Sequence, residues 1–311
     1  MNILITAIGS FSADCVVNSL KKQGHKVIGC DIYPSNWHAV SKDCDAVYQA
    51  PFATNEQEYI LFLIEVCNKE NIDYVFPLTD LEIDVLNRNK NIFTDYKVSI
   101  LLQSEECLSI ARDKFAMYNL FKDDINVNVP FSVSSLELTR DFPIPAIAKP
   151  INGRSSEGLK KITTTKELDT IIGISNYIVQ QCIPGPVFTV DYVRDKFDND
   201  FAVPREELLR TKNGAGTTVR ITPDNLLMEI VSYIGKKLGV IGCVNMEFIL
   251  NEGKYYLIDI NPRFSAGVAF SNFIGYDMIT SHLNSFTGKA ISSIVEFKEQ
   301  IVCKRYKEEL L

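Results

Sequence analysis

The stretch that decides the fold runs from Cys243 to Arg263 and reads CVNMEFILNEGKYYLIDINPR. Residues 244–250 and 255–260 alternate in polarity around turn residues, so the stretch predicts two β-strands joined by a turn. Side chains alternate between faces along a strand, so position parity assigns each residue to a face. The even positions are all apolar (Met246, Phe248, Leu250, Tyr256, Ile258, Ile260), whereas the odd positions include Asn245, Glu247, Asp259 and Asn261.

The turn sets how the two strands pair. A three-residue loop over residues 251–253, with Gly253 in a left-handed conformation, pairs odd positions with odd positions. The face opposite the apolar one then holds the carboxylates of Glu247 and Asp259 close together beside Asn261. Two such carboxylates repel each other unless a cation compensates them. Oxygen ligands of this kind suit Mg²⁺, which takes one or two carboxylates and leaves its other positions to water and phosphates.

The alternative is a solvated hairpin whose outer face happens to be acidic. The end of the stretch argues against it, because Pro262 stops the strand and fixes where Arg263 points. The guanidinium of Arg263 is a planar fork suited to phosphate. The stretch therefore favours a site for a metal ion and a phosphate-bearing ligand.

This stretch resembles the ATP-grasp family, in which a Glu on one strand and an acid-x-Asn-Pro-Arg motif on the next hold magnesium ions and nucleotide phosphates. The resemblance implies ATP and Mg²⁺ (or Mn²⁺) as cofactors, with Glu247, Asp259 and Asn261 as metal ligands. It also implies that Arg263 contacts phosphate or an acyl-phosphate. The family more often has Glu in place of Asp259, which changes the reach of the side chain but not its ligand chemistry. Within that family the chain resembles the stand-alone relatives of the carbamoyl-phosphate synthetase large subunit.

Composition sets broad limits. The chain has 311 residues, of which 46% are hydrophobic and 23% charged, which suits a globular protein of two or three lobes. A net charge of −7 gives no support for binding to nucleic acid or to an anionic membrane. No apolar run reaches the length of a membrane span, and the N-terminus starts as a strand, not as a secretion signal. Eight scattered cysteines without a C-x-x-C motif indicate reduced thiols in a cytoplasmic protein.

The first hundred residues predict a parallel β-α-β lobe. Strands are expected at residues 2–8, 26–31, 46–48, 74–77 and 98–102. Only Gly9 lies in the first turn, so the three-glycine dinucleotide fingerprint is missing. Asp80 follows the strand at 74–77, where ligands gather in open α/β sheets, and is expected to face the reaction centre. The alternative is that Thr79 or Asp80 caps the next helix, and the two roles can coexist.

Two lysines and a glycine-serine loop follow. A lone lysine such as Lys114 is usually solvated, but the resemblance implies that its Asp-Lys context places it on the nucleotide phosphates. Lys149 ends an apolar strand before Pro150, and a buried lysine head needs an anionic partner. The loop behind it, residues 151–158, offers main-chain N–H groups and hydroxyls that can cradle phosphate. By resemblance this loop is a lid, and Ser155 and Ser156 are expected over the phosphates. An ordinary hairpin turn is the alternative.

Residues 177–185 resemble the family's hinge, where the backbone recognises adenine. The resemblance implies that Gln181, Cys182 and Ile183 contact the base. Relatives have an acceptor for the ribose hydroxyls where this chain has Val187, which cannot accept a hydrogen bond. Asp191 is a candidate substitute. This departure is the strongest sequence argument against a fully typical nucleotide site.

Arg205 is the best candidate to bind a substrate carboxylate or the migrating phosphoryl group, because a bidentate fork suits both. The alternative is a surface strand with solvated arginines.

The three histidines follow no pattern and are expected at the surface. Residues 285–311 carry mixed charge and predict nothing specific.

Together these features predict an α/β protein with the ATP-grasp fold: a preATP-grasp lobe (1–103), a small lobe with the lid (104–178) and a large lobe with the metal site (179–311). The implied function is an ATP-dependent ligase that joins a small-molecule carboxylate to an amine, as a possible homodimer. A non-catalytic nucleotide-binding module and a kinase that stops at the acyl-phosphate remain the alternatives. The sequence does not name the substrates.

Overall fold

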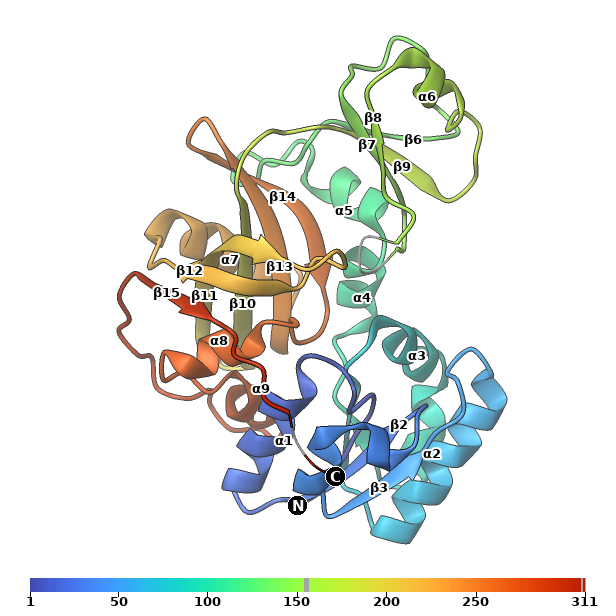
Figure 1. Ribbon diagram of the computed structural model, residues 1–311, viewed down its shortest axis with the longest axis vertical. Coiled ribbons are helices and arrows are strands. Elements are labelled where there is room, and N and C mark those ends of the chain that lie inside the picture. Colours follow the sequence, from blue (N-terminus) through green and yellow to red (C-terminus); the bar gives the residue numbers. More distant parts are fainter. Residues whose placement is uncertain (154–156, 309, 311) are drawn as a thin grey trace.

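The computed structural model describes residues 1–153, 157–308 and 310. Three sheets organise this part of the chain, as Figure 1 shows. The expected α/β fold with an N-terminal parallel sheet and antiparallel sheets after it is confirmed. No helix in the described residues is long and apolar enough to cross a membrane.

The N-terminal lobe is a parallel sheet in the order β3-β2-β1-β4-β5 with helices on both faces. Ile3 and Ile5 on β1 pack with α1, whereas Leu4 between them packs with α2 and α3, as strand alternation requires. The elements are β1 (Asn2–Ile5), α1 (Ala13–Lys22), β2 (Lys26–Asp31), η1 (Ser35–Trp37), η2 (Ala39–Asp43), β3 (Ala46–Gln49), α2 (Glu56–Glu70), β4 (Tyr74–Phe76), α3 (Asp80–Asp95) and β5 (Ser99–Ile100).

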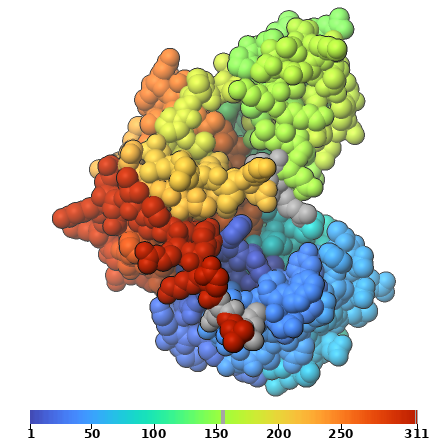
Figure 2. Space-filling model, viewed as in Figure 1, coloured from blue at the N-terminus to red at the C-terminus, as the bar shows by residue number. Residues whose placement is uncertain are grey.

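The small lobe is an antiparallel sheet in the order β6-β9-β7-β8, and it projects from the rest of the molecule in Figure 2. Its own core includes Ala146, Ala148 and Val179 from the sheet together with Leu168 from α6. The elements are β6 (Ser132–Ser134), β7 (Ala146–Pro150), β8 (Lys160–Ile162), α6 (Thr165–Asp169) and β9 (Tyr177–Gln181).

The large lobe is an antiparallel sheet in the order β14-β13-β10-β11-β12-β15. Its apolar face packs against α7 and against the helix pair α4 and α5. The elements are α4 (Glu105–Ala111), α5 (Lys114–Phe121), β10 (Val187–Arg194), β11 (Asp200–Arg210), β12 (Gly216–Ile221), α7 (Asn225–Lys237), β13 (Gly242–Asn251), β14 (Lys254–Asn261), α8 (Val268–Phe273), α9 (Met278–Phe286) and β15 (Gln300–Cys303).

The expected lobe boundaries differ from this arrangement in two places. The division after residue 178 passes through β9, which belongs wholly to the small sheet. Helices α4 and α5 bury Cys107, Met117 and Phe121 against the large sheet, so they do not join the small lobe. Residues 285–311 also have a place in the fold, because β15 pairs with β12 and extends the large sheet by one strand.

The hairpin of β13 and β14 turns differently from the three-residue loop that the sequence predicts. Asn251 pairs with Lys254, so the loop has two residues, Glu252 and Gly253, both with positive φ. Odd positions therefore pair with even positions next to the turn, and Tyr255 and Leu257 enter the apolar core in place of Tyr256 and Ile258. A bulge at Ile258 then shifts the register by one residue and brings Asp259 opposite Glu247.

Candidate active site

One row of side chains crosses the large sheet and organises the site. Asp259 on β14 lies opposite Glu247 on β13, Glu247 lies opposite Thr189 on β10, and Thr189 lies opposite Arg205 on β11. Residues paired in neighbouring strands point to the same face of the sheet. We call these four residues the polar rung. The sheet geometry thus brings together two carboxylates, a hydroxyl and a guanidinium from four strands.

The polar rung lines a cavity of about 300 Å³ that all three lobes contribute to, which we call the central cavity. It is lined by seven of the residues predicted from the sequence: Lys114, Lys149, Arg205, Glu247, Asp259, Asn261 and Arg263. Polar residues that the prediction did not include line it as well, among them Thr189, Glu207, Arg210 and Asn245. Ser155 and Ser156 lie outside the described residues, but Gly153 and Glu157 on either side of them line the cavity.

Each carboxylate of the polar rung has its own cation. Lys114 Nζ lies 3.1 Å from Asp259 Oδ1, and Arg210 donates to Glu247 Oε2 at 3.0 Å. Burial raises the pKa of Glu247; Arg210 opposes this effect and the nearby Asp259 adds to it. The cations therefore relieve a repulsion that the strand pairing imposes.

Lys149 is held by the bulge in β14. The extra residue, Ile258, turns its carbonyl towards β7, and Lys149 Nζ donates to that oxygen at 2.9 Å. Burial lowers the pKa of Lys149 to about 8, with Asp259 and Glu247 acting in the opposite direction and Lys114 adding to the decrease. Lys149 is thus a cation near neutral pH whose charge is easily lost, and an anion in the cavity would stabilise it.

Arg263 is positioned by Asp80. Its Nη2 donates to Asp80 Oδ2 at 2.7 Å, and Arg112 Nη1 lies 3.5 Å from Asp80 Oδ1. Burial raises the pKa of Asp80, but Arg263 and Arg112 outweigh it, so the pKa lies below its usual value. Asp80 does not line the central cavity, and it orients Arg263 from behind. The capping interaction belongs to Thr79, whose N–H and hydroxyl donate to Glu82.

Arg205 is held by an ion pair and hydrogen bonds within the protein, although its Nε is buried without a hydrogen-bond partner in the described residues. Its Nη1 donates to Asp191 Oδ2 at 2.7 Å, and its Nη2 donates to Ser265 Oγ at 3.0 Å. The side chain is 1% exposed, so the solvated-strand alternative is wrong. Both terminal nitrogens have partners within the protein, and the expected contact of Arg205 with a substrate carboxylate or phosphoryl group stays a prediction.

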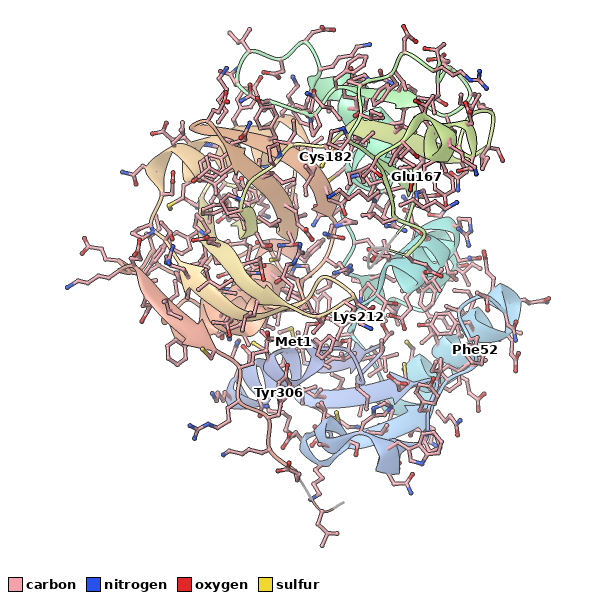
Figure 3. All side chains as sticks on the ribbon, turned by 45° about the horizontal axis from the view of Figure 1, so that its top comes forward. Met1, Phe52, Glu167, Cys182, Lys212 and Tyr306 are labelled. Carbon is pink, nitrogen blue, oxygen red and sulfur yellow. The ribbon has the colours of Figure 1, made fainter. Side chains whose placement is uncertain are left out.

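The predicted hinge residues lie apart from the polar rung. Gln181 is exposed, and Cys182 lies between the small and large lobes in Figure 3. The N–H of Cys182 donates to the carbonyl of Pro145, whereas the N–H of Ile183 has no acceptor among the described residues. None of the three residues lines the central cavity.

Asp191 is not available as the ribose acceptor that the sequence suggested. It is fully buried, and it accepts hydrogen bonds from Arg205, Ser271 and Asn245.

The prediction of surface histidines also fails at one position. His282 is buried and its Nδ1 accepts from the N–H of Cys243, and burial lowers its pKa to about 3.

The donor set fits a magnesium ion. No cluster of three or more His, Cys, Asp and Glu side chains in the described residues could hold a metal ion alone. Mg²⁺ needs only one or two carboxylates when phosphates and water complete its shell. Glu247 and Asp259 supply the two carboxylates. The amide oxygen of Asn261 can add a further ligand, because Asn261 pairs with Asn245 two residues along the same two strands.

Solved structures show the same fold. Biotin carboxylase from Campylobacter jejuni aligns with a TM-score of 0.77 and 18% identity, over 94% of this chain and 72% of that one. The biotin carboxylase domain of Hydrogenobacter thermophilus 2-oxoglutarate carboxylase, solved with MgADP, ADP and bicarbonate, aligns with a TM-score of 0.77 and 15% identity over 94% and 70% of the two chains. These similarities define the class of fold.

Sequence comparison gives the family. An ATP-grasp domain matches residues 111–267, and a PylC-like N-terminal domain matches residues 3–101. The chain therefore belongs to the ATP-grasp family. The carbamoyl phosphate synthase large chain of Thermoplasma volcanium is 23% identical over 84% of this chain. This chain spans only 27% of that relative's length.

Asp80→Asn is expected to lower the free energy of unfolding by roughly 1–3 kcal/mol, because two cations lose a buried counter-charge. Asp84→Asn is the matched control, since Asp84 binds the same Arg112 but is 32% exposed, and it should cost less than about 1 kcal/mol. Urea denaturation near pH 7 measures both. The Asp80 effect should shrink in acid, because stabilisation from a lowered carboxyl pKa is lost as the pH falls through it. Equal losses in the two variants would contradict the role of Asp80.

Proposed function

We propose that this protein is an ATP- and Mg²⁺-dependent ligase that joins a carboxylate to an amine through an acyl-phosphate. The observation that carries the proposal is the pairing of Glu247 with Asp259 in a cavity that also receives Lys114 and Lys149. Opposed carboxylates beside lysines provide a place for a divalent cation and for phosphates together. Membership of the ATP-grasp family supports the same chemistry.

Glu247, Asp259 and Asn261 would hold Mg²⁺, and the bound ion would neutralise charge on the transferring phosphoryl group. Lys114 and Arg210 form ion pairs with Asp259 and Glu247 in the structure. Metal binding to these carboxylates would release both cations towards the phosphates. Lys149 would bind a phosphate from the small-lobe side, and Arg263, oriented by Asp80, would bind from the other. Arg205 would act as a positioning residue that fixes the end of the polar rung.

The reaction requires two displacements. A carboxylate oxygen attacks the γ-phosphorus, the bond to the bridging oxygen of ADP breaks, and an acyl-phosphate forms. The amine nitrogen then attacks the acyl carbon, the bond to the phosphate oxygen breaks, and the nitrogen loses a proton. The cations of the cavity would stabilise the charge on the phosphate oxygens in both steps.

The base of the nucleotide would lie at the junction of β9 and β10. The N–H of Ile183, which has no acceptor among the described residues, would donate to the base, and Gln181 and Cys182 would complete the contact. Ser155 and Ser156 remain proposed phosphate contacts of the lid. Small-molecule substrates, a cytoplasmic location and a homodimer through the N-terminal lobe remain part of the proposal.

A nucleotide-binding module without turnover is the second candidate. It is favoured because neither position considered offers a ribose acceptor: the Val187 side chain cannot accept a hydrogen bond, and Asp191 is engaged by Arg205. Such a module would bind MgADP but release no ADP from ATP with any carboxylate. An acyl-phosphate kinase would release ADP without an amine.

Asp259→Asn is expected to lower the rate of ADP release at least about 100-fold, because removing charge from a metal ligand weakens stabilisation of the migrating phosphoryl group. A coupled assay with ATP, MgCl₂ and a library of carboxylates and amines measures this rate. Glu252→Gln in the exposed turn of the same hairpin is the control and should keep the wild-type rate. Wild-type turnover that needs no divalent cation, or that survives Asp259→Asn, would overturn the proposal.

The affinity for MgADP should fall as the pH rises above about 8, since Lys149 then loses its proton in the free protein. A bound phosphate stabilises the charged lysine, so the dissociation constant should rise by up to about tenfold per pH unit above that value. Calorimetric titration below and above the pKa measures the slope. Lys149→Met should bind more weakly and show a flat profile. A slope that persists in this variant would show that another group titrates.

A further inference from the structure

Glu207 is a buried carboxylate that the proposed phosphoryl chemistry does not use. It lies two residues after Arg205 on β11, so both side chains point to the face of the polar rung, and both line the central cavity. Its side chain is 3% exposed. Oε1 lies 3.4 Å from Arg205 Nε, whereas Oε2 is buried without a hydrogen-bond partner in the described residues.

A second unpartnered atom lies on the same wall. The hydroxyl oxygen of Thr189, opposite Arg205, is buried and also has no hydrogen-bond partner in the part of the chain that the structure covers. Buried polar atoms are nearly always paired, and leaving one unpaired costs about 1–3 kcal/mol. Two such atoms in one cavity wall indicate that a ligand supplies the missing partners.

The backbone around Glu207 makes room for this oxygen. A β-bulge follows Glu207 on β11, and bulges re-aim side chains next to active sites. Across the hairpin lies Gly216, where an added Cβ would lie only 1.9 Å from Glu207 Oε2. The Glu207 carboxylate therefore occupies the space that a side chain at position 216 would need, and only glycine fits there without a shift.

The charge of this wall selects the ligand. Glu247 and Asp259 each contact a cation, Arg210 and Lys114, and belong to the metal side of the cavity. Glu207 faces Arg205 with Oε1, and its unpartnered Oε2 can only accept hydrogen bonds. A phosphate or carboxylate would be repelled there, whereas an ammonium or amine N–H would be bound by a charge-assisted hydrogen bond.

We propose that Glu207, with Thr189, binds the amino group of the acceptor substrate. This inference rests on the proposed ligase function and specifies its acceptor as a primary amine or ammonia, entering from the β11–β12 side. The loop that joins these strands, which carries Lys212, extends towards the N-terminal lobe in Figure 3.

Glu207→Gln is the test, because it keeps the shape of the side chain and removes its charge. With ammonium chloride as the amine, the variant should raise the KM for ammonium about tenfold or more while the KM values for ATP and Mg²⁺ stay within about twofold, as for loss of one charge-assisted hydrogen bond. Glu206→Gln is the matched control. Glu206 is the neighbour on the other face of β11, where it binds Arg220, and its variant should match the wild type.

A second measurement does not depend on turnover. Methylammonium should raise the Tm of the wild type and of Glu206→Gln more than tetramethylammonium does at equal ionic strength, because only methylammonium has N–H donors. Glu207→Gln should lose this difference, and Glu207→Asp should keep part of it. If the wild type shows the difference but never releases ADP, the ligase proposal fails and the amine site stands.

Two outcomes would overturn the inference. One is a wild-type Tm that does not distinguish the two ammonium ions. The other is a Glu207→Gln variant whose KM changes for Mg²⁺ and not for ammonium, which would make Glu207 a metal ligand.

Discussion

The structure depends on placing two carboxylates opposite each other on a sheet and compensating their charge. Strand pairing holds Glu247 and Asp259 on one face, and each needs a cation nearby. Lys114 and Arg210 supply these cations and come from α5 and β11. The same repulsion that requires them makes the position suitable for a divalent ion. Helix α5 and strand β11 therefore each bring a positive charge to the hairpin.

A further set of ion pairs lies behind the cavity and fixes its walls. Asp191 holds Arg205 at one end of the polar rung, and Asp80 holds Arg263 where the N-terminal lobe meets the large lobe. Such pairs are costly to break because each partner is largely buried. They give Asp191 and Asp80 a structural role that requires no contact with a substrate. A residue that the sequence suggests as catalytic can thus act by positioning another side chain that faces the cavity.

Predictions that rest on the alternation of side chains along β13 were correct. Predictions that depend on pairing between segments far apart in the sequence failed. The facing of Glu247 and Asp259 was correctly predicted, but through a wrong loop length that the bulge at Ile258 compensates. A bulge leaves no reliable mark in a sequence. Strand β15 could not be predicted, because its short segment is a strand only by pairing with β12. Arg205 was predicted in the site, but its pairing with Asp191 was not, since their contact depends on the register of β10 and β11.

Glu207 shows the limit of prediction from sequence most directly. It follows another glutamate, and residue type alone does not distinguish Glu206, which binds Arg220, from Glu207, which lines the cavity. Parity relative to Arg205 would have separated them, because Glu207 shares the face of Arg205 and Glu206 does not. That signal needs β11 to be recognised as one strand reaching Arg210, and the apolar run that marks it ends at Val203.

The most direct test of the account is to locate a metal ion in a crystal grown with Mn²⁺ and a non-hydrolysable ATP analogue, using anomalous scattering. If Glu247 and Asp259 hold the metal, a peak is expected about 2 Å from carboxylate oxygens of both, with Lys114 moved from Asp259 towards a phosphate. A peak that contacts neither carboxylate, or a nucleotide bound away from the central cavity, would contradict it.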